Sequence, residues 1–169
     1  PVVWLGALVS VMEKRFNKDA FSASRRFAYG LATTLSVISV ASAIAWALEY
    51  ALSATMIGLT CQGVLASSLL AQRSLRDHVR AVSIPLTAGD IDGARSAVSR
   101  IVGRDTSQLD ASGISTAALE SLAENTSDGV TAPLFWGVVF GLPGIAAYKA
   151  INTLDSMIGH RSARYKTFG

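Results

Sequence analysis

Two long runs without charge limit the folds open to this chain of 169 residues. Residues 28–48 carry no charged side chain over 21 positions, and a helix of about 20 apolar residues crosses the hydrocarbon core of a bilayer. This run is rich in Ala, Ser and Thr, whose small side chains let membrane helices pack closely. A second apolar run, residues 51–71, has Gln62 as its only strongly polar interruption. The pattern predicts a transmembrane hairpin over residues 27–72; a wholly buried helix of a soluble protein is the alternative.

The charges around these runs predict an orientation. Glu49 is the only charged residue between Phe27 and Arg73, and we expect it at a water boundary in the turn of the hairpin. Cytoplasmic flanks of membrane helices carry an excess of Lys and Arg. Both outer ends of the hairpin should therefore be cytoplasmic, with the Glu49 turn outside. The basic residues on the two flanks are Arg25 and Arg26 before the hairpin and Arg73, Arg76 and Arg80 after it.

Composition favours a membrane protein and excludes several kinds of site. Half of the residues are hydrophobic and 16% are charged, against about 25% in soluble domains, and the mean hydropathy is +0.39. Cys61 is the only cysteine, which excludes an intramolecular disulfide and a cysteine-based zinc site. Its apolar surroundings predict a buried thiol. The chain opens at Pro1 and ends at Gly169 without a tail, so we interpret it as a fragment of a longer protein.

Residues 73–128 are predicted to form cytoplasmic helices. Pro85 should end the first of them, because proline cannot donate the backbone hydrogen bond of a helix interior. Asp90 is expected to be the N-cap of a second, amphipathic helix, and Gly103 stands where a C-terminal glycine belongs. A third helix should follow over residues 114–125.

An acidic row occupies the end of this third helix, in the segment ALESLAENTSD. Glu120, Glu124 and Asp128 recur every four residues, so an α-helix would place them in one slowly drifting row. Ile114 and Leu122 fall on the opposite side, which would let the helix pack while the acids stay free. Like charges in one row repel each other unless a cation, a basic partner or a ligand sits among them. The segment is therefore a candidate working site.

Residues 130–148 form a further uncharged run, of 19 residues. Pro133, Pro143 and three glycines interrupt it. Because proline inside a helix removes a hydrogen bond and kinks it, a straight spanning helix is one interpretation and a broken or re-entrant element is the other. Broken backbone is tolerated in a membrane where it faces protein or a wet cavity. For residues 129–169 we predict a Pro/Gly-broken membrane segment followed by a GHR motif (159–161).

Sequence signatures of nucleotide, zinc-protease and serine-hydrolase sites do not occur: the chain has no GxxxxGK[ST], GxGxxG, HExxH or GxSxG. The remaining candidates for a functional site are carboxylates, amides and basic residues beside the apolar runs. Hard oxygen ligands suit Mg²⁺, which commonly joins a protein carboxylate to substrate phosphates, and arginine or lysine clamps phosphate. The set favours a phosphorylated substrate handled with a divalent ion; charged helix ends at a membrane surface are the alternative. Its members are Asp105, Glu120, Glu124, Asn125, Asp128, Asn152, Asp155, His160 and Arg161.

Three strings in this order, ENTSDG (124–129), NTLDSMIGHR (152–161) and YKTFG (165–169), resemble the adenosylcobinamide-phosphate synthase family of cobalamin biosynthesis. The strings SRIVGRDT and PVVWLGALV add to the resemblance, which covers essentially the whole chain. The resemblance implies a polytopic inner-membrane protein. Its members join aminopropanol, as the phosphate or the free alcohol, to a propionate carboxyl of adenosylcobyric acid in an ATP-dependent amide ligation.

With that function, the acidic and amide residues receive hypothetical roles. Making an amide from a carboxylate requires activation, most simply as an acyl phosphate formed with ATP as cosubstrate. Glu124, Asp128 and Asp155 would be catalytic, binding Mg²⁺ or steering the attacking amine, with Glu124 and Asp128 as the metal ligands. Glu124 or Asp128 should then lie close to Asp155 or Arg161. The expected substrate contacts are Asn125, Ser127, Asn152, Arg104, Asp105, His160, Arg161, Tyr165 and Lys166.

The expected architecture is all-α, a single membrane-embedded helical domain over residues 1–169, multi-pass in the cell inner membrane with a cytoplasmic active site. Expected partners are the lipid bilayer, the corrinoid and aminopropanol (phosphate) substrates, and other cobalamin-assembly enzymes, with no nucleic acid. Two alternatives stand beside the ligase. One is a non-catalytic membrane sensor or regulatory protein of the same superfamily. The other is a transporter, which the Pro/Gly-broken segment would fit.

Overall fold

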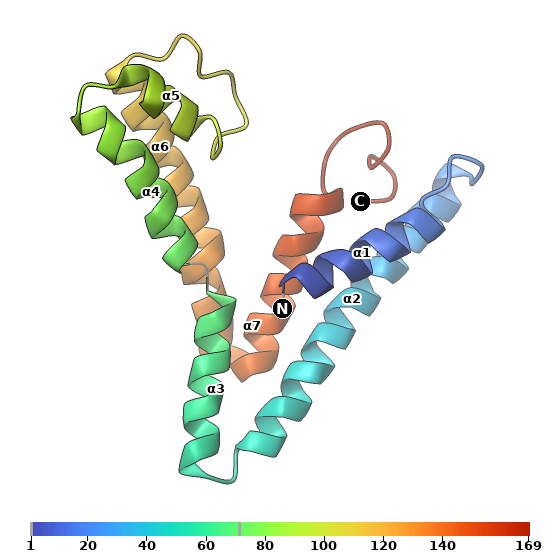
Figure 1. Ribbon diagram of the computed structural model, residues 1–169. Helices are drawn as coiled ribbons and strands as arrows, with labels where there is room; N and C mark the ends of the chain where they lie inside the picture. Colours follow the sequence, from blue (N-terminus) through green and yellow to red (C-terminus); the bar gives the residue numbers. More distant parts are fainter. Residues whose placement is uncertain (1, 71) are drawn as a thin grey trace. The chain divides into compact units, whose positions relative to one another are not determined.

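The computed structural model describes residues 2–70 and 72–169, without the side chains of residues 72–74. Over these residues the chain is helical and contains no strand, which confirms the all-α prediction (Figure 1). The chain forms two compact units, Pro1–Leu69 with Pro133–Gly169 (unit 1) and Leu70–Ala132 (unit 2). The helices are α1 (Val2–Phe16), α2 (Ala23–Leu52), α3 (Met56–Leu69), α4 (Gln72–Thr87), α5 (Ile91–Val98), α6 (Ala111–Thr126), the π-helical turn η1 (Ser127–Thr131) and α7 (Ala132–Ile158).

Unit 1 is built around α2. This helix buries one face, and that face shares a core with α1, seen lying along α2 in Figure 1, and with the second half of α7. The buried face consists mostly of small residues, so neighbouring helices can approach its backbone closely, as the composition of the run predicted. Large apolar side chains such as Leu35, Ile44 and Trp46 point outward and are exposed. The buried positions of α2 are Gly30, Thr33, Val37, Ala41 and Ala45.

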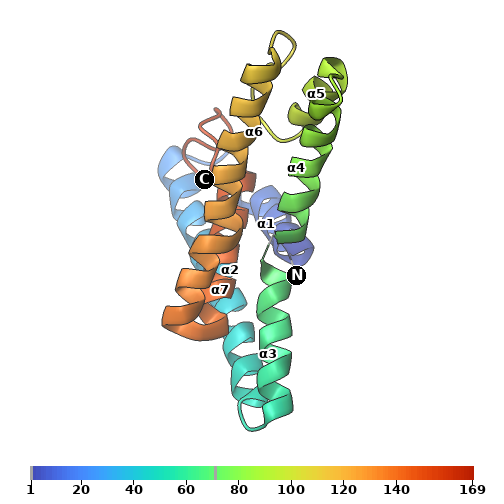
Figure 2. The same cartoon turned by 90° about the vertical axis from the view of Figure 1, so that its left-hand side faces the viewer.

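Unit 2 is a small bundle in which α4 and α6 lie side by side (Figure 2) and α5 packs on both, around buried Val98 and Ile114. The predicted N-cap is confirmed, because the Asp90 carboxylate accepts from Gly93 N at 2.9 Å. Asp110 caps α6 in the same way, through Gly113 N at 2.7 Å. Both caps use a short side-chain oxygen to satisfy an N–H that has no partner inside its own helix.

Two predicted helix ends in unit 2 are wrong. α4 continues past Pro85 to Thr87, because the Ile84 and Pro85 carbonyls both accept from Ala88 N, at 3.2 and 3.1 Å. α5 ends at Val98, before the predicted glycine stop at Gly103. Turns replace its last part: Arg100 N and Ile101 N each donate to the carbonyl three residues back, whereas Val102 N donates to the Val98 carbonyl four residues back.

Among the residues that the structure describes, two helical stretches have the length and apolar composition of a membrane-crossing helix, Ala23–Leu52 and Ala111–Ile158. The second arm of the predicted hairpin is shorter than expected, since α3 has 14 residues and a span needs about 20. The turn comes after Leu52 rather than at Glu49, because Thr55 Oγ1 accepts from Gly58 N at 3.0 Å and starts α3 there. The thiol of Cys61 is exposed, so the prediction of a buried thiol is wrong. Ala71, the last residue of the predicted run, lies outside the described residues.

The third uncharged run is broken, as one of the two interpretations predicted. The break is at Gly141, whose φ of 68° and ψ of −153° leave the helical region. A Cβ on Gly137 would lie 2.7 Å from the Ile145 side chain, and one on Gly144 would overlap the Trp136 carbonyl. In a straight helix, residues eight apart are separated by about 12 Å along the axis. The chain therefore doubles back at Gly141, which favours the re-entrant form (Figure 1).

Glycine rather than proline makes this break. Pro133 lies in the first turn of α7, and Pro143 lies in the first turn after Gly141. A proline is tolerated at such positions, since the N–H that it lacks would have no helical partner there. Gly141 adopts a positive φ, which residues with a Cβ reach only with strain. Attributing the break to Pro133 and Pro143 is therefore incorrect.

The carboxylate of Glu49 satisfies the backbone at the break. Glu49 Oε2 accepts from Leu142 N at 3.1 Å, and a Cβ at position 141 would collide with the same carboxylate. The Glu49 carbonyl in turn accepts from Gln62 Nε2 at 3.2 Å. The one charged residue of the long apolar segment is therefore an acceptor for the turn at Gly141.

Replacing Gly141 with alanine tests this turn. Gly141→Ala should lower the free energy of unfolding by about 1–3 kcal/mol, because the new Cβ strains a positive φ and collides with Glu49. The measurement is thermal or denaturant unfolding of the full-length protein in detergent. Gly63→Ala is the matched control, since a Cβ there meets nothing within 4 Å. That change should stabilise α3 by up to about 1 kcal/mol. Equal stability of the two variants would contradict the turn at Gly141.

Candidate functional site

The acidic segment lies on α6 and on the π-helical turn that follows it. Ile114 is fully buried, whereas Glu120 and Glu124 are exposed, which confirms that α6 packs with its opposite face. Asp128 is half-buried in η1. The row of three acids therefore ends on a π-helical turn rather than on a continuous α-helix.

Two predicted site residues on the loop before α6 have protein partners. Arg104 Nη2 lies 2.7 Å from Glu120 Oε2, with both side chains more than half exposed, so this ion pair contributes little to stability. The Asp105 carboxylate accepts from Ser107 N at 2.9 Å and from Ser107 Oγ at 3.2 Å. The backbone hydrogen bond, followed by the hydroxyl, holds the pKa of Asp105 below its usual value. Asp105 therefore stays ionised and organises the loop.

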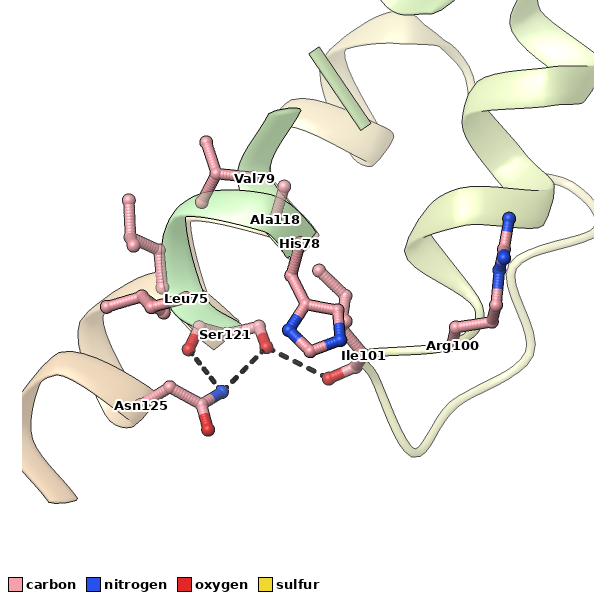
Figure 3. Close-up of a pocket in the computed structure, with 9 residues that line it drawn as sticks. Leu75, His78, Val79, Arg100, Ile101, Ala118, Ser121 and Asn125 are labelled. Atoms are coloured by element: carbon pink, nitrogen blue, oxygen red, sulfur yellow. Dashed lines mark hydrogen bonds between the residues drawn. The ribbon is translucent and has the colours of Figure 1, made fainter. Parts of the chain in front are cut away.

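A pocket of about 260 Å³ opens beside α6 in unit 2 (Figure 3). Ser121, which is buried, donates to the Ile101 carbonyl at 2.9 Å. Asn125 Nδ2 donates to Ser121 O at 2.8 Å and to Ser121 Oγ at 3.2 Å. His78 and Arg100 also line the pocket. Of these polar residues the sequence predicted only Asn125; the spacing of four between Ser121 and Asn125 was the available signal.

The second group of predicted residues lies at the end of α7 and in the loop after it, in unit 1. Asn152 is half-buried and Asp155 is exposed, and the Asp155 carbonyl accepts from Gly159 N at 2.9 Å. His160 Nε2 lies 3.0 Å from the Ser156 carbonyl, one of the free acceptors at this helix end. The imidazole is therefore held beside the last turn of α7.

The other predicted residues of this group are either packed against the core or exposed. Tyr165 is half-buried against the core of unit 1, with its ring centroid 6.3 Å from that of His160. Arg161 and Lys166 are exposed. The sequence missed Lys149, three residues before Asn152, whose side chain is only 9% exposed. Lysine is rarely buried unless it is paired, so its place in α7 marks it as a further candidate.

A partly buried polar network holds this C-terminal loop, and the sequence did not predict it. Arg164 donates through Nε to Glu13 Oε1 at 2.8 Å, and its Nη2 lies 2.7 Å from the same oxygen. Asn17 Nδ2 donates to Glu13 Oε1 and to the Arg164 carbonyl, both at 3.1 Å. Arg26 donates to Asn17 Oδ1 at 2.9 Å and also to the Arg164 carbonyl. The pKa of Arg164 is raised, mainly because Arg164 donates a hydrogen bond to the Glu13 carboxylate.

The YKTFG string closes the loop onto α2. Phe168 is 3% exposed and belongs to the core of unit 1. Its carbonyl lies so close to Gly30 that a Cβ on Gly30 would overlap it. Only glycine allows this approach of the loop to the helix. The string therefore fixes the loop that carries His160 and Arg161.

The predicted residues thus form two groups. Unit 2 holds Glu124, Asn125, Ser127 and Asp128, together with Arg104 and Asp105 on the preceding loop. Within residues 2–70 and 72–169, no three His, Cys, Asp or Glu side chains are close enough to hold a metal ion. Unit 1 holds Asn152, Asp155, His160, Arg161, Tyr165 and Lys166.

Comparison with known proteins assigns the chain to a family. A family model described as CobD/Cbib protein matches residues 1–169. The chain belongs to the CobD/Cbib family. The family and its relatives place it in cobalamin biosynthesis and confirm the resemblance found in the sequence motifs. No solved structure shows a significant match.

Among curated CobD/Cbib relatives, the cobalamin biosynthesis protein CobD of Rhodobacter capsulatus is 57% identical over 169 residues, covering 100% of this chain and 53% of that protein. CobD of Brucella anthropi is 48% identical over 170 residues, and CobD of Rhizobium meliloti is 42% identical over 170 residues. Each of these two alignments covers 100% of this chain and 52% of the relative. The chain spans about half the length of the curated CobD/Cbib relatives it matches.

Glu13 allows a test of how the C-terminal loop of this CobD/Cbib chain is held. Glu13→Gln removes the charge that pairs with Arg164, so trypsin cleavage after Arg161 and Arg164 in the folded full-length protein should accelerate on the order of tenfold. Asp19→Asn is the matched control, because that carboxylate is 95% exposed and lies 3.7 Å from Arg26. It should leave the cleavage rate unchanged. Equal rates in wild type and Glu13→Gln would show that the loop does not depend on this network.

Proposed function

We propose that the full-length protein joins an aminopropanol side chain, as its phosphate or free alcohol, to the propionate carboxyl of adenosylcobyric acid in an ATP-dependent amide ligation. The observation that carries this proposal is the family match over the whole chain, whose motifs place exposed acids and amides on α6 and at the end of α7. A sensor or regulatory protein has little need to concentrate such groups at two helix ends. The exposed acid Glu124 and the half-buried amide Asn152 are typical of groups that handle a polar substrate.

Residues of both groups would take part in the reaction. A substrate carboxylate oxygen attacks the terminal phosphorus of ATP, which gives an acyl phosphate and ADP. The amine nitrogen then attacks the acyl carbon, phosphate leaves, and the nitrogen gives up one proton to a base. Glu124 or Asp155 would steer the amine and take that proton, because each is an exposed carboxylate. Asn125, Ser127 and Asn152 would position the substrates, with Asp105 and Tyr165 beside them. Phosphate oxygens would contact Arg104, His160, Arg161 and Lys166.

We propose that the chain would hold Mg²⁺, which commonly takes one or two protein carboxylates and completes its shell with water and phosphate. Glu124 and Asp128 would be these ligands, four residues apart across the end of α6. When bound, the ion would screen the charge on the ATP phosphates.

We place the protein in the cell inner membrane, with the ligation site on the cytoplasmic side. α2, with 30 residues and an outward face of large apolar side chains, supports this location. Basic residues on both flanks of the α2–α3 pair support a cytoplasmic orientation of those ends. The lipid bilayer and other cobalamin-assembly enzymes would be its partners.

Alanine at Glu124 or at Asp155 tests the proposed chemistry. Either change should lower ligation by at least about 100-fold, because each removes a group that would position or deprotonate the amine. The measurement is ATP consumption and amide formation by the purified full-length protein with adenosylcobyric acid and aminopropanol phosphate. Both variants should retain membrane insertion and the wild-type melting temperature.

Asp77→Ala is the control, since Asp77 is an exposed acid on α4 outside both groups. It should leave the rate of ligation unchanged. Wild-type rates in both Glu124→Ala and Asp155→Ala would refute the residue roles. Wild-type protein that consumes no ATP with these substrates would refute the ligase and favour the sensor or the transporter.

Metal binding can be measured apart from turnover. Mn²⁺, followed by electron paramagnetic resonance, replaces Mg²⁺ as the probe. Glu124→Gln and Asp128→Asn should each weaken Mn²⁺ binding on the order of tenfold, because each removes one charged ligand. Glu120→Gln should leave the affinity unchanged, since Glu120 is paired with Arg104. Unchanged affinity in the first two variants would contradict a site on α6 and η1.

A further inference from the structure

The pocket in unit 2 has walls from three parts of the bundle. α4 contributes His78, the turn after α5 contributes Arg100, and α6 contributes Ser121 and Asn125. The remaining lining residues are apolar, and Leu75 is one of them. In Figure 3, Ser121 and Asn125 lie on one side of the view, Arg100 lies on the other, and the His78 ring lies between them. The pocket therefore combines polar groups at both sides and in the middle with apolar lining residues.

The charge of the lining favours an anion. No carboxylate lines the pocket, whereas Arg100 brings a permanent positive charge. Arg100 donates through Nε to the Ser96 carbonyl at 3.3 Å, and none of the carboxylates that the structure describes pairs with it. By contrast, Arg95 and Arg104 on the same bundle each pair with an acid. The guanidinium of Arg100 thus retains donors for a ligand phosphate or carboxylate.

Asn125 provides an acceptor for a second group of the ligand. Ser121 O can only accept a hydrogen bond, so its 2.8 Å contact fixes Nδ2 as the Asn125 atom that faces it. Ser121 Oγ is itself oriented, because it donates to Ile101 O at 2.9 Å. The Asn125 Oδ1 atom has no donor among the described residues. Asn125 is exposed, so an ammonium or hydroxyl of a ligand can reach Oδ1 and donate to it.

The volume limits the size of the occupant. Drug-sized ligands use pockets of about 300–1,000 Å³, and this one has about 260 Å³. A whole nucleotide or corrinoid is larger than this volume, whereas a three-carbon amino alcohol carrying one phosphate is small enough to lie in it.

We propose that this pocket binds the small amino-alcohol phosphate, with its phosphate on Arg100 and its amine on Asn125 Oδ1. This inference rests on the proposed ligase function and adds Arg100, Ser121 and His78 to its machinery. Asn125 is the neighbour of Glu124 on α6, so the amine would enter the site beside the residue proposed to steer it. The amine end then leads toward the acidic segment and the phosphate end stays in the pocket.

Arg100→Gln in the full-length protein tests the pocket. The KM for amino-alcohol phosphate and its Kd by calorimetry should both rise about 10- to 100-fold, the loss expected when one charged hydrogen-bond partner is removed. The KM for ATP, and the KM for the unphosphorylated amino alcohol, should change less than about twofold, because neither contact involves Arg100. Arg100→Lys should restore part of the affinity. Arg76→Gln, an exposed arginine on α4 outside the pocket, should behave as wild type.

Each outcome has a distinct meaning. An unchanged KM and Kd in Arg100→Gln, with a wild-type melting temperature, would overturn the pocket assignment while leaving the ligase intact. Calorimetric binding that needs Arg100, in a protein that forms no amide, would retain the pocket and refute the proposed function. A lipid headgroup with an amine and a phosphate shares this chemistry, so the titration is made in phosphatidylcholine nanodiscs and repeated with phosphatidylethanolamine present. Affinity lost only in the second series would identify the headgroup as the occupant and overturn the proposal.

Discussion

One hydrogen bond between a carboxylate and a backbone amide shapes the apolar part of unit 1. A helix that turns back on itself leaves an N–H group without a helical partner. Burying such a group unsatisfied in an apolar environment costs on the order of several kcal/mol. Glu49 Oε2 meets Leu142 N at 3.1 Å and removes that cost. With the turn stabilised, the second half of α7 runs back along the core shared by α1 and α2. The direction of that returning segment determines where the site residues after Asn152 lie.

Local patterns in the sequence were sufficient for some of these features. The small-residue face of α2, the Asp90 cap and the interruption of residues 130–148 each follow from spacing or from residue type within a few positions. The exact place of the break did not follow. Proline looks disruptive in a sequence, yet its cost depends on whether its position needs an N–H. Gly141 is decisive because of its positive φ, and that depends on its distant partner Glu49.

In the candidate site, too, some features could be predicted from local sequence patterns and others could not. Exposure of Glu120 and Glu124 was predictable, since the period of α6 separates them from buried Ile114. The bond between Glu13 and Arg164 joins residues 151 positions apart, and no periodicity connects them. The pocket of unit 2 likewise combines residues from α4, the turn after α5 and α6. The π-helical turn was also missed, because a four-residue repeat of acids looks regular whichever helix type carries it.

These contacts join residues that are far apart in the sequence, and this separation affects the order in which they form during translation. During translation, α2 leaves the ribosome well before Leu142, so Glu49 spends that interval without the amide it later satisfies. Arg164 follows Glu13 by 151 residues, so Glu13 remains without this partner for longer than Glu49 remains without Leu142. Contacts that close such large loops form late in folding, because the chain entropy must be lost before they contribute. A nascent chain therefore holds Glu49 without its amide partner, and Glu13 without its arginine, until the segments that carry Leu142 and Arg164 have been made.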